Sequence, residues 1–294
     1  MGDRTKVTLG LGLGVLAVSS AASFVLLAAP LPPLVVAAGR VSITALLLAA
    51  LGIRTWPRAL RSLRERPALR RRVALAGALL ALHFGTWIAS LTLTTVLRSM
   101  ALVALQPMFA GVLGRLLGDR VSPWLYVGAA VSCAGTWVLI GAGAEAGDGA
   151  QARLVGDLLA LVGGAAAAAY LAAGRSVRDD LPLSNYLSLV NVTAAALLAL
   201  AVVAFGVGIP AVHDGAWGAV VVLGVVPGVI GHGLFNWVVR KVPVHIVSFA
   251  VLLEPIGASL IAFVLLGRTV TMWEVVGTAI VLLGVAVGTR APKT

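Results

Sequence analysis

Two histidines, each followed by a tryptophan or asparagine at helical spacing, stand out in an otherwise apolar sequence. His83 precedes Trp87 by four residues, and His232 precedes Asn236 by four residues, with Trp237 next to it. On a helix, residues four apart lie on one face. Such a face could recognise an amphipathic solute through hydrogen bonds to its polar end and stacking on its apolar body. It could also join helices, since histidine and asparagine bond across helix interfaces in membranes.

Glu254 is the one acidic side chain near the middle of a long apolar run, and Pro255 follows it. Proline interrupts the backbone hydrogen bonds of a helix, so this point could bind a proton, a cation or an amine. The carboxyl group could instead clamp two helices. Gln106, before Pro107, is a neutral polar companion. Arg40 could snorkel to the outer surface or neutralise a carboxyl group, which would stabilise the fold, or it could bind an anionic substrate.

Other chemistry finds little support in the residues. Cys133 is the only cysteine, and neither His83 nor His232 has a second metal-ligand residue at short spacing, so we expect no metal. Ser90 lies seven residues from His83, about 10 Å along a helix, which is too far for a catalytic pair. There is no G-x-S-x-G turn and no phosphate-binding Gly-rich loop. We therefore predict that the chain is not an enzyme and uses no cofactor.

The composition requires lipid as the solvent. The 294 residues are 60% hydrophobic and 11% charged, whereas about a quarter of an ordinary soluble domain is charged. A membrane-spanning helix needs about 20 apolar residues, and the sequence contains ten such segments. They are about 7–29, 32–53, 73–95, 97–117, 123–143, 156–174, 184–206, 216–238, 244–266 and 272–289.

Basic residues set the predicted orientation. With the N-terminus inside, eighteen of the 22 lysines and arginines fall in cytoplasmic loops or ends, and Arg98, Arg153 and Arg268 fall outside. This bias predicts that both termini are cytoplasmic. Eight arginines lie in residues 54–72, which could suggest nucleic acid. Between two spans, such a run is typical of a topology determinant resting on anionic lipid headgroups, so we expect membrane lipid and no nucleic acid as a partner.

The two halves of the sequence resemble each other. Leu105-Gln106-Pro107 corresponds to Leu253-Glu254-Pro255, and each opens a run ending in Leu-Leu-Gly. The offset is 148 at Gln106/Glu254 and 149 from Gly118/Gly267 onward. His83 and His232 are also 149 apart. Five spans per copy is an odd number, so the second copy, 149–294, must be inserted inverted relative to the first, 1–148. Inverted repeats of this kind occur in many secondary transporters.

The sequence resembles the drug/metabolite transporter superfamily, specifically its EamA-like ten-helix family. The best-matching piece is 252–267 (LLEPIGASLIAFVLLG), which is similar to the family's Glu-Pro helix and following turn. Residues 231–237 (GHGLFNW) and the pair His83/Trp87 resemble a bacterial branch. The chain departs from the pattern at Gln106, Asp119 and Arg268, where the family often has Glu. The resemblance implies efflux of amino acids, metabolites or drugs.

We therefore predict an all-α integral membrane protein of ten transmembrane helices in two inverted five-helix repeats. The expected function is secondary transport of small metabolites or amphipathic drugs by alternating access, with proton coupling through Glu254 as an option. The expected substrate-binding residues are His83, Trp87, Gln106, His232, Asn236 and Trp237. A flippase for lipid-linked substrates and an intramembrane hydrolase remain alternatives. The expected location is a bacterial-type plasma membrane, and both a monomer and a homodimer stay open.

Overall fold

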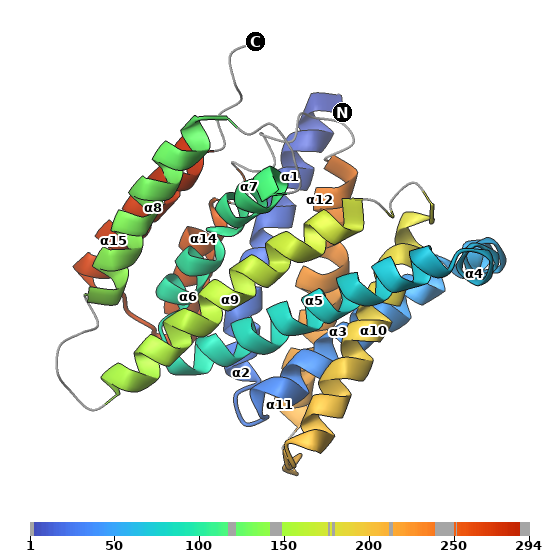
Figure 1. The fold of residues 1–294 in the computed structure, drawn as a ribbon. Coiled ribbons are helices and arrows are strands. Elements are labelled where there is room, and N and C mark those ends of the chain that lie inside the picture. Colours follow the sequence, from blue (N-terminus) through green and yellow to red (C-terminus); the bar gives the residue numbers. More distant parts are fainter. Residues whose placement is uncertain are drawn as a thin grey trace.

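The computed structural model describes residues 3–116, 122–141, 149–175, 177, 180–211, 214–238, 250 and 252–288. Over these ranges the secondary structure is helical, without a strand (Figure 1). The elements are α1 (Asp3–Ser19), α2 (Ala21–Leu27), α3 (Pro33–Leu51), η1 (Ile53–Thr55), α4 (Trp56–Glu65), α5 (Pro67–Leu93), α6 (Val96–Val103), α7 (Gln106–Leu116), α8 (Trp124–Gly141), α9 (Ala150–Arg175), α10 (Leu183–Ala204), α11 (Asp214–Leu223), the π-helical η2 (Gly224–Gly231), α12 (His232–Val238), α14 (Glu254–Leu266) and α15 (Met272–Gly288).

The helices have the length and composition of membrane spans. Within the described ranges, seven spans are long and apolar enough to cross a bilayer: Thr5–Leu27, Pro33–Leu51, Pro67–Leu93, Val96–Leu116, Ala150–Gly174, Leu183–Ala204 and Gly215–Phe235. Three shorter apolar helices overlap the other predicted segments: Trp124–Leu139, Glu254–Leu266 and Met272–Gly288. The chain is thus a multi-pass, all-helical membrane protein, as predicted. Ten spans and an inverted repeat stay predictions, and residues 244–249 and 251 of the ninth segment lie outside the described residues.

Several spans are built from two shorter helices, which the hydrophobic pattern alone did not predict. The first span divides at Ser20, between α1 and α2, and the fourth divides before Gln106, between α6 and α7. In the eighth span Pro227 lies inside η2, where its missing N–H and the wider π-helical turn occur together. Such interruptions leave backbone groups off the regular helical ladder, and neighbouring helices can satisfy them.

The C-terminal end of α14 explains the Leu-Leu-Gly turn of the second half. Gly267 has a positive φ of 62°, a conformation that glycine adopts without steric cost. Its N–H donates to the carbonyl of Phe263 at 2.9 Å, and the N–H of Arg268 donates to Ala262 at 3.3 Å. These bonds satisfy carbonyls that the helix end would leave free. The corresponding turn of the first half, at Leu117 and Gly118, lies outside the described residues.

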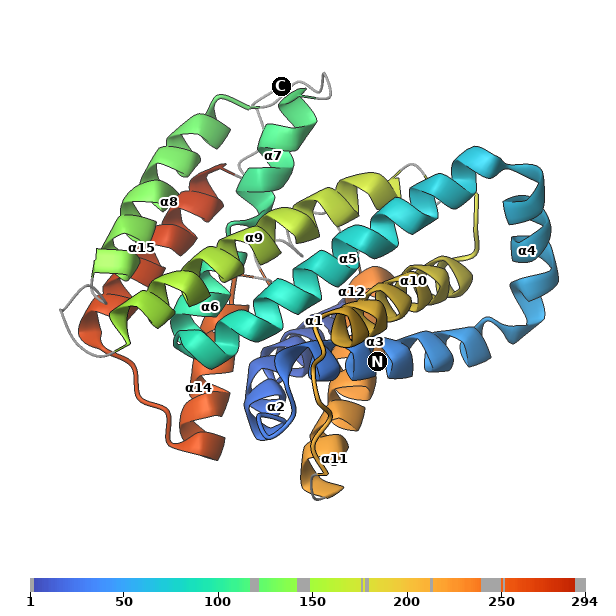
Figure 2. The same ribbon diagram turned by 60° about the horizontal axis from the view of Figure 1, so that its bottom comes forward.

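Three long helix pairs organise the bundle. α5 packs along α9, α3 along α10, and α8 along α15, and both ribbon views show each pair side by side (Figures 1 and 2). The α8–α15 pair is close because glycines face each other: a methyl group at Gly128 would meet Gly284 and Gly288, and one at Gly135 would meet Gly277 and Val281. Small residues let helix backbones approach in membranes, where dispersion contacts drive helix association.

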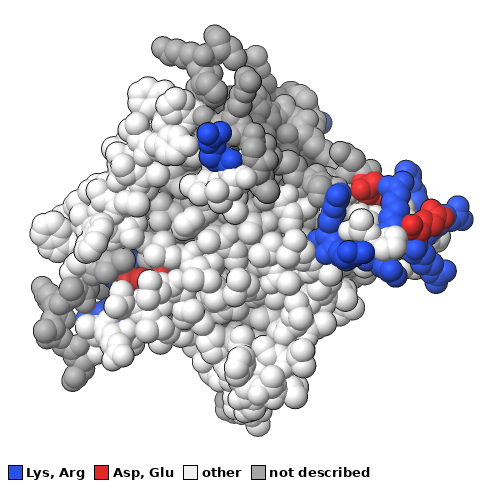
Figure 3. All heavy atoms as spheres, in the orientation of Figure 1, with Lys and Arg blue, Asp and Glu red and all other residues white. Residues whose placement is uncertain are grey.

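The arginine-rich segment folds as a separate surface element. α4 projects from one end of the bundle, and Lys and Arg side chains gather there while most of the rest of that face is uncharged (Figure 3). Large apolar side chains such as Leu46 and Leu116 are exposed on the bundle, as expected of a surface in contact with lipid. α5 starts at Pro67, six residues before the predicted third span, because Pro is favoured in the first helical turn.

Candidate functional site

A buried arginine lies against two aromatic rings between α3 and α5. Arg40, on α3, is only 2% exposed, so it does not snorkel to the surface as one interpretation of the sequence had it. Its guanidinium carbon lies 4.0 Å from the centre of the Phe84 ring and 5.7 Å from that of Trp87. Both rings are on α5, one turn apart. A cation over an aromatic face is attracted by the negative charge of that face.

His83 extends this cluster on the same turn of α5. Its ring is parallel to that of Trp87, with centroids 6.1 Å apart and an angle of 6°, and it lies 4.7 Å from the Phe84 ring. The Nδ1 atom is 2.9 Å from the carbonyl oxygen of Gly163 on α9. If Nδ1 carries the proton and donates to that carbonyl, Nε2 is left as the free acceptor. The spacing of His83 and Trp87 therefore does produce one common face.

His232 brings the eighth span to the same cluster. It is the first residue of α12, directly after η2, and its side chain is exposed. It is close enough to interact electrostatically with both Arg40 and His83. His83 and His232 are thus within electrostatic range of Arg40, and η2, which directly precedes His232, packs on α3. We call Arg40, His83, Phe84, Trp87 and His232 the cationic aromatic cluster.

The other expected site residues lie elsewhere or cannot be placed. Trp237 packs against α1, where a methyl group at Gly10 would meet its ring. Gln106 begins α7 and Glu254 begins α14, and both are half-buried. Within the part of the chain that the structure describes, neither side chain forms a hydrogen bond to the cluster. The side chain of Asn236 lies outside the described residues.

Ser90, which shares the sequence spacing of His83 and Trp87, joins helices. It is fully buried; its hydroxyl donates to the carbonyl of Trp87 at 2.7 Å and lies 2.6 Å from the hydroxyl of Ser99 on α6. This geometry fits the alternative in which polar side chains hold membrane helices together. One face of α5 therefore carries the aromatic rings near its middle and, toward its C-terminal end, a serine that forms a hydrogen bond to α6.

A second polar centre, between α6 and α9, was not found by sequence reasoning. Arg98, which the count of basic residues placed on the outer side at the start of the fourth predicted span, is in α6, is 3% exposed, and forms an ion pair with Asp157, which is 0% exposed. Its Nε also donates to Thr94, whose hydroxyl donates to Asp157 at 2.8 Å, and a terminal nitrogen donates to the carbonyl of Leu139. Arg98 is therefore a buried structural residue, neutralised inside the bundle by a partner 59 residues away.

Glu274, near the start of α15, is a further buried charged residue and lies close to the start of α6. Its side chain accepts the backbone N–H of Thr271 at 2.8 Å, and its own N–H donates to the Thr271 hydroxyl at 3.2 Å. This reciprocal arrangement is a capping box at the start of α15. The hydroxyl of Thr95, just before α6, donates to the same carboxylate. These bonds join α15 to α6 by buried polar contacts.

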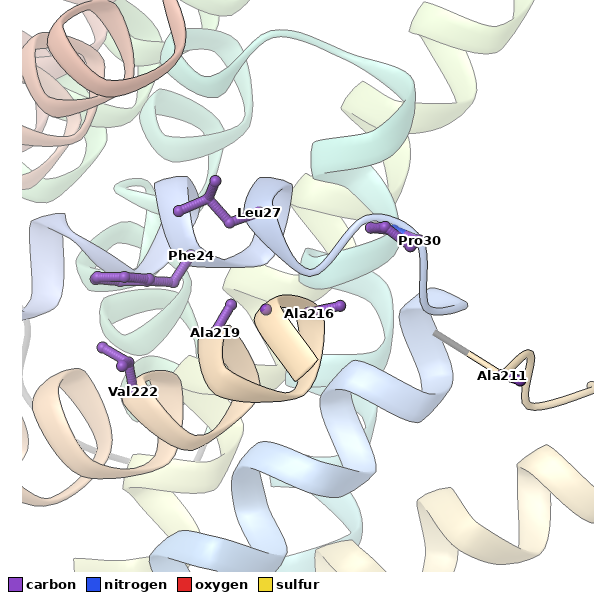
Figure 4. A pocket seen from close by; sticks show the side chains of 8 residues that line it. Phe24, Leu27, Pro30, Ala211, Ala216, Ala219 and Val222 are labelled. Carbon is purple, nitrogen blue, oxygen red and sulfur yellow. The ribbon is translucent and has the colours of Figure 1, made fainter. Parts of the chain in front are cut away.

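An apolar pocket lies apart from both polar centres. It has a volume of about 480 Å³ and is lined by Phe24, Leu27, Pro30, Ala211, Gly215, Ala216, Ala219 and Val222. Figure 4 shows side chains of α2 and α11 along its walls. None of these described lining residues has a charged or amide side chain that could fix the polar end of a solute. We place the candidate substrate site at the cationic aromatic cluster.

Comparisons with known proteins fit this architecture. Residues 154–289 match the EamA-like transporter family. The second half of this chain is thus similar to the EamA-like transporter family. An uncharacterized transporter of Archaeoglobus fulgidus is 25% identical over 210 residues, 71% of this chain and 73% of its own. The uncharacterized transporter YyaM of Bacillus subtilis is 24% identical over 206 residues, 68% of this chain and 67% of its own.

The fold likeness extends over nearly the whole chain. A protein crystal structure that is 23% identical superposes with a TM-score of 0.64, covering 97% of this chain and 96% of that one. It shows that the helices of both halves are arranged as in a known fold. The resemblance predicted from the Glu-Pro helix, the Leu-Leu-Gly turn and residues 231–237 is confirmed by the family match, which contains all three.

Proposed function

We propose that this protein is a secondary transporter that exports small metabolites, such as amino acids or amphipathic drugs, by alternating access. The observation that carries the proposal is the cationic aromatic cluster, a set of polar and aromatic side chains inside a bundle of apolar helices. Ionisable groups are expensive in such a bundle and are usually functional. The relatives that are named transporters support the same class of function.

The packing of α8 on α15 supports an inverted repeat. Take a contact between a residue of α8 and a residue of α15. If 149 is added to the number of the first residue and subtracted from the number of the second, the two resulting residues also form a contact between α8 and α15. The contact of Gly128 with Gly288 becomes that of Gly277 with Leu139, and the contact of Gly135 with Val281 becomes that of Gly284 with Ser132. Both contacts of each matched pair are close approaches of the two helices, as a twofold relation between two copies would produce.

A second helix pair follows the same rule. A methyl group at Gly14, on α1, would meet Phe235 on α12, and one at Gly163, on α9, would meet Thr86 on α5. Gly163 is 149 positions after Gly14, and Thr86 is 149 positions before Phe235. Alternating access by rocking of two such repeats places a substrate site where the halves meet, and the cluster draws on residues from both halves.

We further propose Glu254 as the proton-coupling residue. It begins α14, directly before Pro255, and in the described part of the chain no ion pair neutralises it. A half-buried carboxyl group without a counter-charge can accept a proton on one side of the membrane and release it on the other. The alternative is a facilitator in which Glu254 only supports the start of α14.

The test uses purified protein in liposomes. We expect uptake of radiolabelled L-phenylalanine, driven against its gradient by a pH difference, in wild-type vesicles and not in Glu254→Gln vesicles. Counterflow without a pH difference should persist in the variant, because Gln keeps the size and hydrogen bonding of Glu. Continued pH-driven accumulation by Glu254→Gln would eliminate this residue as the coupling site. Movement of a fluorescent lipid instead of any water-soluble solute would favour a flippase.

A further inference from the structure

The guanidinium of Arg40 is buried without a counter-ion. Within the described residues, ion pairs join Arg98 to Asp157 and Arg66 to Asp180, but none involves Arg40. Its Nε has no hydrogen-bond partner, although the residue is only 2% exposed. The Phe84 ring offers attraction on one side and no acceptor for the N–H groups. A charge buried in this way is unfavourable unless something neutralises it.

The indole of Trp87 is a second donor without a partner. Trp87 is 5% exposed, and its Nε1–H makes no hydrogen bond in the described part of the protein. Buried indole N–H groups usually find an acceptor. Two unsatisfied donors, one of them charged, therefore lie on neighbouring helices, with the guanidinium carbon 5.7 Å from the indole ring. Both N–H groups lack a hydrogen-bond acceptor, such as an oxygen atom.

Within the described residues no acidic side chain, Glu254 included, forms an ion pair with Arg40. Asp157 is held by Arg98 and Thr94, and Glu274 by Thr95 and Thr271. Arg40 is close enough for electrostatic interaction with His83 and His232, which add no negative charge. An anionic oxygen acceptor would satisfy both the charge and the N–H groups, and a carboxylate matches one guanidinium with a single negative charge and two parallel hydrogen bonds.

We propose that Arg40 and Trp87 form a carboxylate-binding subsite, so that the transported solutes are amphipathic organic acids. The guanidinium donates to the carboxylate oxygens and the indole N–H adds a third hydrogen bond. The stacked rings of His83 and Trp87 hold the apolar body of the solute. This inference rests on the proposed transport function, because it names the class of substrate that the cationic aromatic cluster takes.

The first test compares two probes that differ only in charge. N-acetyl-L-phenylalanine has a carboxylate where N-acetyl-L-phenylalaninamide has a neutral amide. We expect the acid to bind purified protein at least tenfold more tightly, about the effect of one charge-assisted hydrogen bond. Arg40→Gln should remove this preference, and Arg66→Gln, on the exposed surface, should keep it. Equal binding of acid and amide to the wild type, or equal loss of both in Arg40→Gln, would overturn the proposal.

A second test needs no ligand. Because the guanidinium has no ion-pair partner among the described residues, Arg40→Met should leave the thermal unfolding temperature unchanged or raise it. Arg98→Met, which removes an arginine buried to the same depth but fully paired, should lower it. A fall of similar size in both variants would show that Arg40 is structural and would overturn the proposal.

Trp87→Phe keeps an aromatic ring but removes the indole N–H, so it should weaken binding of the acid. An unchanged affinity would contradict the role of the indole N–H.

Transport measurements distinguish a failure of this inference from a failure of the proposed function. All measurements use vesicles of phosphatidylcholine alone, so that an anionic lipid headgroup cannot occupy the subsite. If the acid binds selectively but no solute is moved, transport fails and the subsite stands. If the vesicles move neutral and cationic solutes as well as acids, transport stands and the carboxylate subsite is wrong.

Discussion

Removing Arg98 should destabilise the protein severely. In Arg98→Met, the carboxylate of Asp157 stays 0% exposed and keeps only the hydrogen bond from Thr94, while the carbonyl of Leu139 loses its donor. Breaking one side of a buried ion pair costs about 3–5 kcal/mol, because the remaining charge is left uncompensated. The Arg66–Asp180 pair provides a comparison, since its arginine is 59% exposed. Arg66→Met should cost no more than about 1 kcal/mol.

The free energy of unfolding can be measured by titrating the protein from mild-detergent micelles with a denaturing detergent and following helicity. The double variant Arg98→Met with Asp157→Leu removes both charges, so it should recover at least half of the loss. The resulting coupling energy between the two positions is expected to be about 2 kcal/mol or more. A loss below about 1 kcal/mol in Arg98→Met, or additive losses in the double variant, would refute the view that the charges of Arg98 and Asp157 neutralise each other.

Three other outcomes follow from the same structure. Gly284→Ala should cost about 1–3 kcal/mol of unfolding free energy, since the methyl group would meet Ser132, whereas Gly12→Ala, with nothing within 4 Å, should cost nothing; equal effects would contradict the close packing of α8 and α15. Thr271→Val should lower stability by about 1 kcal/mol through loss of the cap on α15, and an unchanged unfolding curve would show that the cap contributes nothing. A reporter fused after Thr294 should be active only in the cytoplasm; activity on the other side would reverse the predicted orientation.

The fold class was predictable because the bilayer imposes one length and one composition on every span. The breaks within spans were less predictable, since Ser20 has no strong local signal and Pro227 allows either a kink or a π-helical turn. The ion pair of Arg98 was not predicted for another reason. Hydropathy treats each charge alone, but a charge can enter the bundle when a distant residue such as Asp157 neutralises it.

The candidate site was predictable only in part. The four-residue spacing of His83 and Trp87 is a local property of a helix, and the structure stacks their rings accordingly. Which residues of other helices approach them is a tertiary property, so the neighbours of Arg40 could not be predicted from one sequence. For the same reason Trp237, adjacent in sequence to a promising residue, could be expected in the site although it packs on α1.

The inverted repeat that we propose gives the matched contacts between α8 and α15 a consequence for the divergence of the two halves. An interface that maps onto itself has the form found between identical subunits, where each contact occurs twice with the same residues. Within a single chain the two occurrences are encoded separately. The hydroxyl of Ser132 donates to the carbonyl of Val281 at 3.2 Å, while Val281, the counterpart of Ser132 149 positions later, has no hydroxyl to return the bond. A pair of identical half-length chains would have both bonds or neither, so one gene encoding both halves can place a polar contact on one side of the interface alone.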